Sequence, residues 1–549
     1  MHIVVYLINE FIKSEKKIIF IIFVLSLAIS LLEVNVISVI TAEIINALQT
    51  KIIKSVYKYF IFLVVISLCY IGLGYIYNKM QYLLINKMKL MIKHDLVKII
   101  LKVYNARSME SSPIHFNSPI NRISENCHIF INSIIAYAFP SIALLTVIAG
   151  YFLIKNVKFG LLFVSTIIII SVYINYKLKY LAIKNKEYEN AIMEHENSQI
   201  EILGNVDKIV HTGQTSIELD KFLEKTKSTI ISANKINNET NSIGINANLI
   251  LHTCIFITAF YLIHMQITNN INITTFITFF TIILIFKERF MWSIQDLPYF
   301  LEFIGRSNNV ADTMKSIPEQ YIKAISTKYV EYNLPFRKVV FRNVGFKYIS
   351  GKTNILENYN TELEFKNNII GIVGPSGKGK STIAKLMIKS FDYTGDILLD
   401  NVDLRTIDSD YIHKNIVYVS QTSILFNRNI SDNLLYGCDN IEKCKIQLKH
   451  LDKFPKLKTL ITDMLVNNKM VGHLGEKVSG GQRQIINIIN GMIGDAKVVI
   501  LDEPTNALDP ELKKELIQYI HSYKSRKNAI IIITHDKDVI PIFDKIITP

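Results

Sequence analysis

A glycine-rich turn contains the residue types that bind phosphate. Residues 374–382 read Gly-Pro-Ser-Gly-Lys-Gly-Lys-Ser-Thr and satisfy the pattern G-x-x-x-x-G-K-[ST]. Glycines let successive backbone N–H groups point at one anion, and a following helix adds its positive end. Lys380 is expected to reach the β- and γ-phosphates, and Ser381 to offer its hydroxyl to Mg²⁺. The expected nucleotide contacts are Gly374, Ser376, Gly377, Lys378, Gly379, Lys380, Ser381 and Thr382.

Two later apolar runs end in groups suited to phosphoryl transfer. Val498–Asp502 is followed by Glu503, and Ala529–Thr534 is followed by His535. Asp502 can hold Mg²⁺ through water, and Glu503 is placed to polarise the attacking water. A lone histidine after a strand is more often structural, but after these motifs His535 is expected to hold the γ-phosphate and water in line. Glu503 and His535 are therefore the predicted catalytic residues.

A second phosphate-type site precedes a predicted helix. It consists of Ser479, Gly480, Gly481 and Gln482, and small residues with a serine at a helix start suit an anion. One chain already has its own phosphate loop, so this second site indicates use in trans. Two chains facing head to tail would each complete the ATP site of the other.

These groups need strands and helices to position them. Residues 368–373 form a short apolar run that enters the glycine-rich turn, and residues 380–390 have a helical pattern. Residues 339–348 alternate apolar and polar side chains, as a strand does. Strand, glycine loop and helix in this order predict an α/β fold of the P-loop NTPase type.

The first half of the chain has a different composition. Half of the 549 residues are hydrophobic, the mean hydropathy is +0.26, and long apolar runs extend to about residue 290. A spanning helix needs roughly 17 to 25 apolar residues. Six runs meet this requirement: residues 18–40, 59–77, 134–154, 159–176, 249–265 and 273–290.

Loop charges predict how these spans are oriented. The long segments after the second and fourth spans are rich in Lys and Arg, whereas the opposite connections are short, so the long segments and both termini are expected to be cytoplasmic. Helical periodicity flanks polar interruptions at residues 111–118 and 211–216, which predicts two turns that could contact a cytosolic motor. The net charge of +14 indicates attraction to anionic lipid. No nucleic-acid motif occurs, and no nucleic-acid partner is expected.

Polar residues inside the spans and the cysteines lead to two further expectations. Glu33, Asn35, His252 and Glu288 are candidates to line a substrate path, although hydrogen bonding between helices or snorkelling would explain each equally well. The chain has five cysteines without regular spacing. This pattern argues against a disulfide framework or a zinc site, so reduced thiols are expected.

From about Phe341 to the end, these motifs resemble the nucleotide-binding domain of ABC transporters, and the whole chain resembles an exporter-type (type IV) half-transporter. The resemblance implies that Tyr348 stacks on adenine, that Gln421 contacts Mg²⁺ and senses the membrane domain, and that Asp509 lies in the D-loop. Residues 374–382 match Walker A, 471–475 the X-loop, 478–482 the signature, Asp502 and Glu503 Walker B and the catalytic glutamate, and His535 the switch histidine.

The sequence departs from the family pattern at several places. Val478 stands where Leu is usual, His473 replaces an X-loop acid, and Asn506 replaces a Ser. Ile485, Asn487, Ile489 and Asn490 stand where small residues and arginines are usual. The family normally continues beyond residue 549 through another strand and a helix, so an exposed or partner-covered sheet edge is expected. These departures bear on turnover and coupling but remove none of the groups that the chemistry needs.

The predicted architecture is an all-α membrane domain at residues 1–310, with six transmembrane helices and long cytoplasmic extensions. A linker follows at residues 311–335, and an α/β P-loop ABC nucleotide-binding domain occupies residues 336–549. The expected cofactors are ATP and Mg²⁺, with Ser381, Gln421 and Asp502 as metal ligands. The expected partner is a second copy or a paralogous half-transporter, and the expected function is ATP-driven export of an unidentified lipid or peptide. The alternative is a non-transporting membrane ATPase that acts as a gate or an assembly platform.

Overall fold

A computed structural model describes residues 3–106, 116–295, 321, 332–348, 351, 353–375, 377–422, 424–467, 470–506 and 508–549. The chain divides into two compact units. One unit comprises Met1–Ile99 and Ile114–Glu319, and the other comprises Ile100–Pro113 and Gln320–Pro549. Most of the predicted linker at residues 311–335 lies outside the described residues.

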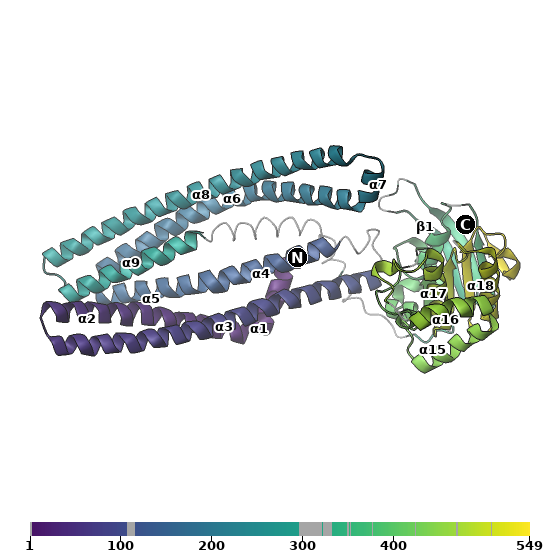
Figure 1. Cartoon of the computed structure of the whole chain (residues 1–549), viewed down its shortest axis with the longest axis horizontal. Helices are drawn as coiled ribbons and strands as arrows, with labels where there is room; N and C mark the ends of the chain where they lie inside the picture. Colours follow the sequence, from purple (N-terminus) through teal and green to yellow (C-terminus); the bar gives the residue numbers. More distant parts are fainter. Residues whose placement is uncertain are drawn as a thin grey trace. The chain divides into compact units, whose positions relative to one another are not determined.

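The first unit is built from helices, as its long apolar runs predict (Figure 1). Two short π-helical segments, η1 and η3, interrupt α-helical runs. The elements are α1 (Ile3–Leu31), η1 (Leu32–Ile37), α2 (Ser38–Gln49), α3 (Ile53–Ala106), α4 (Asn117–Ser133), η3 (Ile134–Ala138), α5 (Phe139–Lys155), α6 (Val157–Gly204), α7 (Val206–His211), α8 (Thr215–Ile267) and α9 (Ile273–Gln295). The last residues of α3, from Ile100 on, are assigned to the second unit.

Within the described part of the chain, five helical stretches are long and apolar enough to cross a membrane. They are Val4–Gln49, Ile53–Asn105, Pro119–Lys155, Val157–Gly204 and Thr215–Ile267, and they contain the first five predicted spans. The sixth predicted span lies on α9, whose last turns carry Lys287, Glu288 and Arg289. The unit is therefore a multi-pass helical membrane domain.

Three of these helices run far beyond the thickness of a bilayer. α3, α6 and α8 have 54, 48 and 53 residues, which at about 1.5 Å per residue is roughly 70 to 80 Å, against a hydrocarbon core of about 30 Å. α6 and α8 lie side by side and are joined through α7 (Figure 1). The turn expected at residues 211–216 is present, with Gly213 at φ 67°. Most of the turn expected at residues 111–118 lies outside the described residues.

Aromatic packing holds α5, α6 and α9 together. The ring of Phe152 is fully buried, and its centroid lies 4.8 Å from that of Phe159, 5.1 Å from Phe163 and 4.9 Å from Phe279. Such edge-to-face and tilted pairs contribute about 0.5–1.5 kcal/mol each beyond the burial of their area. They fix the core of the membrane unit.

The second unit contains two sheets and the helices around them. A five-stranded parallel sheet has the order β6-β7-β8-β3-β9, and a four-stranded antiparallel sheet has the order β2-β1-β4-β5. The strands are β1 (Lys338–Phe346), β2 (Leu356–Glu364), β3 (Asn368–Val373), β4 (Thr394–Leu399), β5 (Val402–Asp403), β6 (Ile416–Val419), β7 (Val498–Asp502), β8 (Ala529–Thr534) and β9 (Lys545–Ile547).

The helices of this unit are short. They are α12 (Lys380–Met387), η4 (Leu404–Thr406), α13 (Ser409–Asn415), α14 (Ile430–Leu434), α15 (Ile441–Leu448), η5 (Lys449–Lys453), α16 (Pro455–Asn467), η6 (His473–Gly475), α17 (Gly480–Ile493), α18 (Pro510–Ser522), η7 (Lys524–Arg526) and η8 (Ile540–Ile542). α12 begins where predicted but ends three residues early, and Lys389 then adopts φ 57°.

The parallel sheet explains why the chemical motifs meet. Every residue of β7 and β8 is buried, as the continuous apolar runs of such strands predict. β3 pairs with β8 from Asn368↔Ala529 to Val373↔Thr534, and β7 pairs with β8 from the same end. The carboxyl ends of all three strands therefore share one edge of the sheet. β9 lies at the outer edge, beside β3.

The cysteine prediction was wrong for one pair. Cys438 and Cys444 form a disulfide with their Cα atoms 6.5 Å apart, a separation that disulfides accept. The turn between α14 and α15 brings the two residues together, which their irregular spacing in the chain did not indicate. Cys69, Cys127 and Cys254 are free thiols.

Candidate functional site

A cavity of about 500 Å³ lies at the carboxyl ends of β3 and β7. Its lining unites most of the predicted nucleotide, metal and catalytic residues. The lining residues are Tyr348, Ile355, Gly377, Gly379, Lys380, Ser381, Thr382, Gln421, Asp502, Glu503 and His535. Gly374 and Lys378 do not line it, and Ser376 lies outside the described residues. Motifs that are far apart in the chain thus meet at one place in the fold.

The glycine-rich turn has the backbone shape that a phosphate loop needs. Gly377 and Gly379 adopt φ 81° and 85°, a left-handed conformation that favours glycine. Gly379 directly precedes α12, and Lys380, Ser381 and Thr382 of its first turn line the cavity. Lys380 donates from Nζ to the carbonyl oxygens of Gly374 at 2.8 Å and Pro375 at 3.0 Å. The ammonium group is therefore held across the loop that would surround the phosphates.

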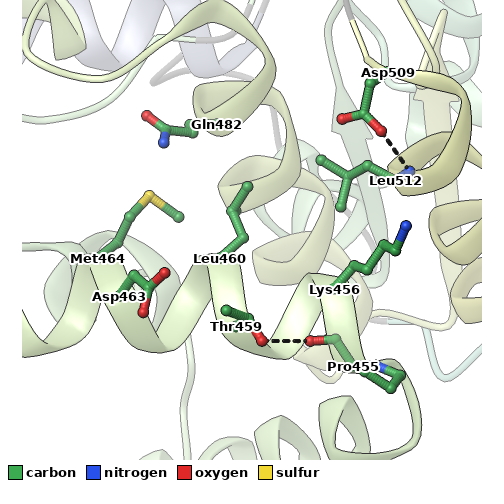
Figure 2. A pocket seen from close by; sticks show the side chains of 9 residues that line it. All are labelled: Pro455, Lys456, Thr459, Leu460, Asp463, Met464, Gln482, Asp509 and Leu512. Carbon is green, nitrogen blue, oxygen red and sulfur yellow. Dashed lines mark hydrogen bonds between the residues drawn. The ribbon is translucent and has the colours of Figure 1, made fainter.

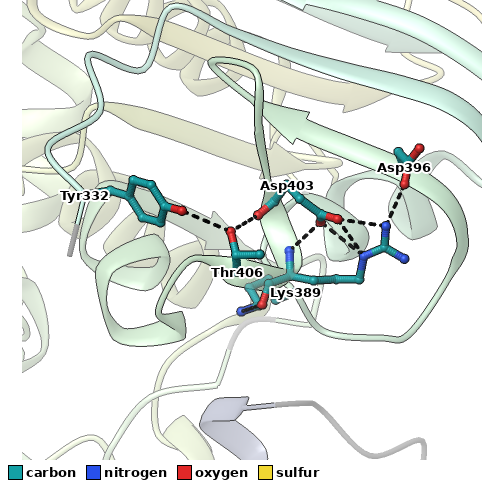
Figure 3. Close-up of polar contacts among 6 residues, drawn as sticks. Tyr332, Lys389, Asp396, Asp403 and Thr406 are labelled. Carbon is teal, nitrogen blue, oxygen red and sulfur yellow. Dashed lines mark hydrogen bonds and ion pairs between the residues drawn. The ribbon is translucent and has the colours of Figure 1, made fainter. Parts of the chain in front are cut away.

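The C-terminal end of α12 is anchored through a polar cluster (Figure 3). Burial lowers the pKa of Lys389, whose Nζ donates to the carbonyl oxygen of Ile407 at 2.5 Å. Arg405 beside it donates to Asp403 at 3.1 Å and to Asp396 at 2.6 Å. The bond from Lys389 attaches the segment that follows α12 to the chain just after η4.

Glu503 and His535 are in direct contact. Nδ1 of His535 lies 2.8 Å from Oε1 of Glu503, and the hydroxyl of Thr534 donates to Oε2 at 3.2 Å. The side chain of Glu503 is only 9 % exposed, whereas the imidazole is 67 % exposed. The carboxylate is thus oriented from two sides, and the imidazole remains open to the cavity. Thr534 was not predicted, although its place at the end of β8, just before His535, could have suggested it.

Asp502 has a partner that the sequence did not reveal. Tyr418, on β6, donates from its hydroxyl to Oδ2 of Asp502 at 2.6 Å. Burial raises the pKa of Tyr418, and the hydrogen bond to Asp502 raises it further. The phenol therefore stays protonated at neutral pH. One carboxylate oxygen is therefore fixed, which orients the other. The family motif indicated Gln421, three residues further along the chain, but not Tyr418.

Tyr348 is held at the rim of the same cavity. Its hydroxyl lies 3.2 Å from the hydroxyl of Thr382. Its ring packs edge-on against Phe346 and Phe391, with centroid distances of 4.8 and 5.5 Å. The aromatic ring is therefore positioned by the antiparallel sheet and attached to the first turn of α12.

The second anion-type motif lies outside this cavity. Ser479 accepts from the backbone N–H of Gln482 at 3.2 Å, and the side chain of Gln482 accepts from the backbone N–H of Ser479 at 2.9 Å. This capping box begins α17. None of Ser479, Gly480, Gly481 and Gln482 lines the cavity that holds Lys380 and Glu503.

Gln482 instead lines a separate pocket of about 580 Å³ together with Asp509 and side chains of α16 (Figure 2). Asp509 caps α18 by accepting from the N–H of Leu512 at 2.9 Å. Leu460 and Met464 provide an apolar part of this pocket. Of the four residues predicted for the signature site, Gln482 thus shares one pocket with Asp509, the residue predicted for the D-loop, and this pocket is distinct from the first cavity.

A further cavity of about 460 Å³ lies in the membrane unit. Arg289 on α9 donates to Glu33 on η1 at 3.3 Å and to the hydroxyl of Tyr70 at 3.1 Å. Ser26 also lines it, with a hydroxyl that is buried and has no partner among the described residues. Of the polar residues proposed for a substrate path, only Glu33 lines this cavity. His252 bonds within its own helix, to the carbonyl of Asn248 at 2.8 Å.

Known proteins resemble the chain in two ways. A family model described as ABC transporter matches residues 356–506. The leukotoxin translocation ATP-binding protein LktB of a Pasteurella haemolytica-like species is 31 % identical over 240 residues, which are 43 % of this chain and 33 % of that protein. The α-hemolysin translocation ATP-binding protein HlyB of Escherichia coli O6:H1 is 30 % identical over 240 residues, with the same coverage. The matched part thus spans about a third of these relatives.

The fold resembles a solved exporter over nearly its full length. A bacterial Atm1-family ABC exporter with ATP bound matches with a TM-score of 0.77 at 17 % identity, covering 97 % of this chain and 93 % of that one. At this identity the likeness concerns the fold. Residues 356–506 thus match the ABC transporter family model, they follow an N-terminal membrane domain, and the chain has the fold of an ABC exporter.

Proposed function

We propose that this chain is one half of an ATP-driven exporter that works as a dimer by alternating access. The observation that carries the proposal is the cavity at the carboxyl ends of β3 and β7. It combines the glycine-rich loop, Lys380, Asp502, Glu503 and His535, while Ser479 and its neighbours lie outside it. The ABC transporter domain implies ATP as the nucleotide.

The residues of the cavity have distinct proposed roles. Lys380, now held by loop carbonyls at 2.8 and 3.0 Å, exchanges them for phosphate oxygens when ATP enters. Glu503 orients the attacking water and takes up its proton at a carboxylate oxygen. His535, held against Oε1 of Glu503, orients the γ-phosphate, and Tyr348 stacks on the adenine.

Mg²⁺ is the proposed metal, because it prefers oxygen ligands and is commonly held by substrate phosphates with few protein groups. Ser381, Gln421 and Asp502 bring a hydroxyl, an amide and a carboxylate to one cavity, and this donor set fits the ion. When bound, it would supply neutralisation of the phosphate charge. Tyr418 would keep the carboxylate of Asp502 in the orientation that this requires.

The second copy is proposed to complete the site. Ser479, Gly480, Gly481 and Gln482 begin α17, where free backbone N–H groups suit a phosphate. None of them lines the cavity of the chain's own Lys380, and Gln482 lines a separate pocket with Asp509. We therefore assign them to the ATP of a partner chain, either identical or paralogous. Binding of two ATP molecules would close the pair, and hydrolysis would reopen it.

The membrane unit is proposed to carry the substrate. The relatives named above are toxin translocation ATP-binding proteins, which supports export. The polar cavity near Glu33 and Arg289 is the proposed substrate cavity, and its ion pair and tyrosines favour a peptide over a purely apolar lipid. The nucleotide-binding domain is proposed to lie in the cytoplasm.

The test measures the movement of candidate substrates across the membrane of sealed vesicles that contain the purified protein and ATP. Candidate peptides and lipids are screened first for stimulation of ATP hydrolysis, and those that stimulate it are then followed across the membrane. Export that requires ATP and stops with Glu503→Gln supports the proposal. ATP hydrolysis without flux of any stimulating compound would contradict it and favour a gate or assembly platform.

A further inference from the structure

The backbone of Glu503 has a conformation that its neighbours must maintain. Its φ is 49°, in the left-handed region that residues with a Cβ rarely adopt. Such conformations persist where surrounding contacts impose them, and they occur often in functional sites. The placement of the carboxylate therefore depends on how the peptide groups on either side of Glu503 are held.

Contacts from different elements hold this residue. The N–H of Glu503 donates to the carbonyl oxygen of Ile533 at 2.8 Å, and the carboxylate contacts Thr534 and His535. All three of these partners lie on β8 or directly after it. The carbonyl oxygen of Glu503 accepts from the N–H of Asn506 at 3.4 Å. The same oxygen accepts a much shorter bond, 2.5 Å long, from Nε2 of Gln484.

Gln484 connects Glu503 with the signature helix. It lies on α17, five residues after Ser479, and is 5 % exposed. Its neighbours Ile485 and Ile486 are fully buried, so α17 is packed into the core at this turn. A helix moves as a rigid element over one or two turns. Displacement of its N-terminal end at Ser479 would therefore be transmitted to the carbonyl oxygen of Glu503.

We infer that Gln484 is a positioning residue that couples the two ATP sites of the dimer. When Ser479 engages the partner's nucleotide, α17 is fixed, and Gln484 fixes the peptide group that sets the carboxylate of Glu503. Hydrolysis in one site thus depends on occupancy of the other. The inference rests on the proposed function only in assigning Ser479 to the ATP of a partner chain.

The experiment measures ATP hydrolysis by the full chain in lipid, for the wild type, Gln484→Met, Ser479→Ala and the double variant. Methionine matches the size of glutamine but cannot donate. We expect Gln484→Met to lower kcat about tenfold, the effect of one well-placed hydrogen bond, with KM and ATP binding changed by less than about twofold. The fold loss of kcat in the double variant should be smaller than the product of the two single losses, because both substitutions act through one connection.

Asn433→Leu is the matched control. Asn433 lies on α14, is as buried as Gln484, and donates from its side-chain amide to the carbonyl oxygens of Phe426 and Asn429, both at 3.0 Å. Its loss should lower the midpoint of thermal unfolding and leave kcat unchanged. If Gln484→Met does not fold, Gln484→Ser replaces it with the same expectation, because its shorter side chain cannot reach Glu503.

Each outcome decides a separate point. If Gln484→Met lowers only the unfolding midpoint, as Asn433→Leu should, the positioning role is overturned. If the fold loss of kcat in the double variant equals the product of the two single losses, the coupling is overturned. If Ser479→Ala has no effect on kcat while Gln484→Met does, the dimer assignment fails and the positioning of Glu503 stands. Hydrolysis without flux would count against the proposed transport and not against Gln484.

Discussion

Nδ1 of His535 lies 2.8 Å from Oε1 of Glu503 at the carboxyl ends of two neighbouring strands. The two residues are 32 positions apart in the chain, and the pairing of β7 with β8 brings them together. The imidazole is the exposed member of the pair and the carboxylate the buried one. This relationship places an imidazole and a carboxylate at one edge of the cavity, where we propose an orienting group and a proton acceptor.

Replacing His535 with alanine should lower the rate of ATP hydrolysis by about 100-fold, the usual contribution of a positioned acid, base or orienting group. The affinity for ATP should change little, because Lys380 and the glycine loop are untouched. Steady-state hydrolysis and equilibrium binding of a fluorescent ATP analogue measure the two effects. His521→Ala is the control, since His521 is an exposed residue of α18 away from the cavity. Equal rates for both variants would contradict the role of His535.

The hydroxyl of Tyr418 should influence the metal rather than the nucleotide. Tyr418→Phe removes the 2.6 Å bond to Asp502 and leaves the carboxylate free to turn. The Mg²⁺ concentration for half-maximal hydrolysis should rise about tenfold, as losses of such supporting contacts usually cause, while the rate at saturating Mg²⁺ is largely kept. Tyr393→Phe is the control, because the Tyr393 hydroxyl has no partner within the described part of the chain. An unchanged Mg²⁺ requirement would refute this role for Tyr418.

Much of the second unit could be predicted from the sequence. β3 and β8 have the predicted bounds because parallel strands buried on both faces are continuous apolar runs. Lys380, Asp502, Glu503 and His535 all end or follow strands that the sequence predicted, and all four line one cavity. Tyr418 and Gln484 could not be found in this way, because their hydrogen bonds join residues 84 and 19 positions apart. The sequence around either residue does not indicate such a tertiary contact.

In the membrane unit, too, part of the structure could be predicted from the sequence and part could not. Hydropathy identified the apolar part of each span, and the helical periodicity of the long segments predicted that helices extend beyond it, as α3, α6 and α8 do with 54, 48 and 53 residues. The exact lengths of these helices were not predicted, because beyond the apolar part the helical pattern belongs to a polar surface. The pairing of Glu33 with Arg289 also escaped prediction. It depends on which helices are neighbours, which single-helix patterns do not encode.

The buried ammonium group of Lys527 should make stability depend on alkaline pH. Burial lowers the pKa of Lys527 from 10.5 to about 8 in the folded protein. Between these values the unfolded chain binds more protons than the folded chain, so the contribution of Lys527 to stability increases with pH and is lost as the pH falls through 8. The unfolding midpoint of the wild type should rise relative to Lys527→Met between about pH 7.5 and about pH 9.5. Calorimetry measures the difference, and a constant or falling difference would contradict the lowered pKa.

The disulfide predicts a simple labelling pattern. Cys438 and Cys444 are bonded, and the three remaining cysteines are free. Iodoacetamide applied to the denatured protein should therefore label three cysteines without a reductant and all five after reduction. Mass spectrometry counts the labels and assigns them to peptides. Labelling of Cys438 and Cys444 before reduction would show that both are thiols, as their sequence spacing suggested.

The central claim is that Glu503 activates water for ATP hydrolysis in the cavity shared with Lys380 and His535. Glu503→Gln keeps the size of the side chain and its contact with Thr534 but removes the proton acceptor. Hydrolysis by the full chain in lipid, measured together with ATP binding, tests the claim most directly. The rate should fall about 10²- to 10⁴-fold while ATP still binds with nearly the wild-type affinity. Undiminished hydrolysis by Glu503→Gln would contradict the account.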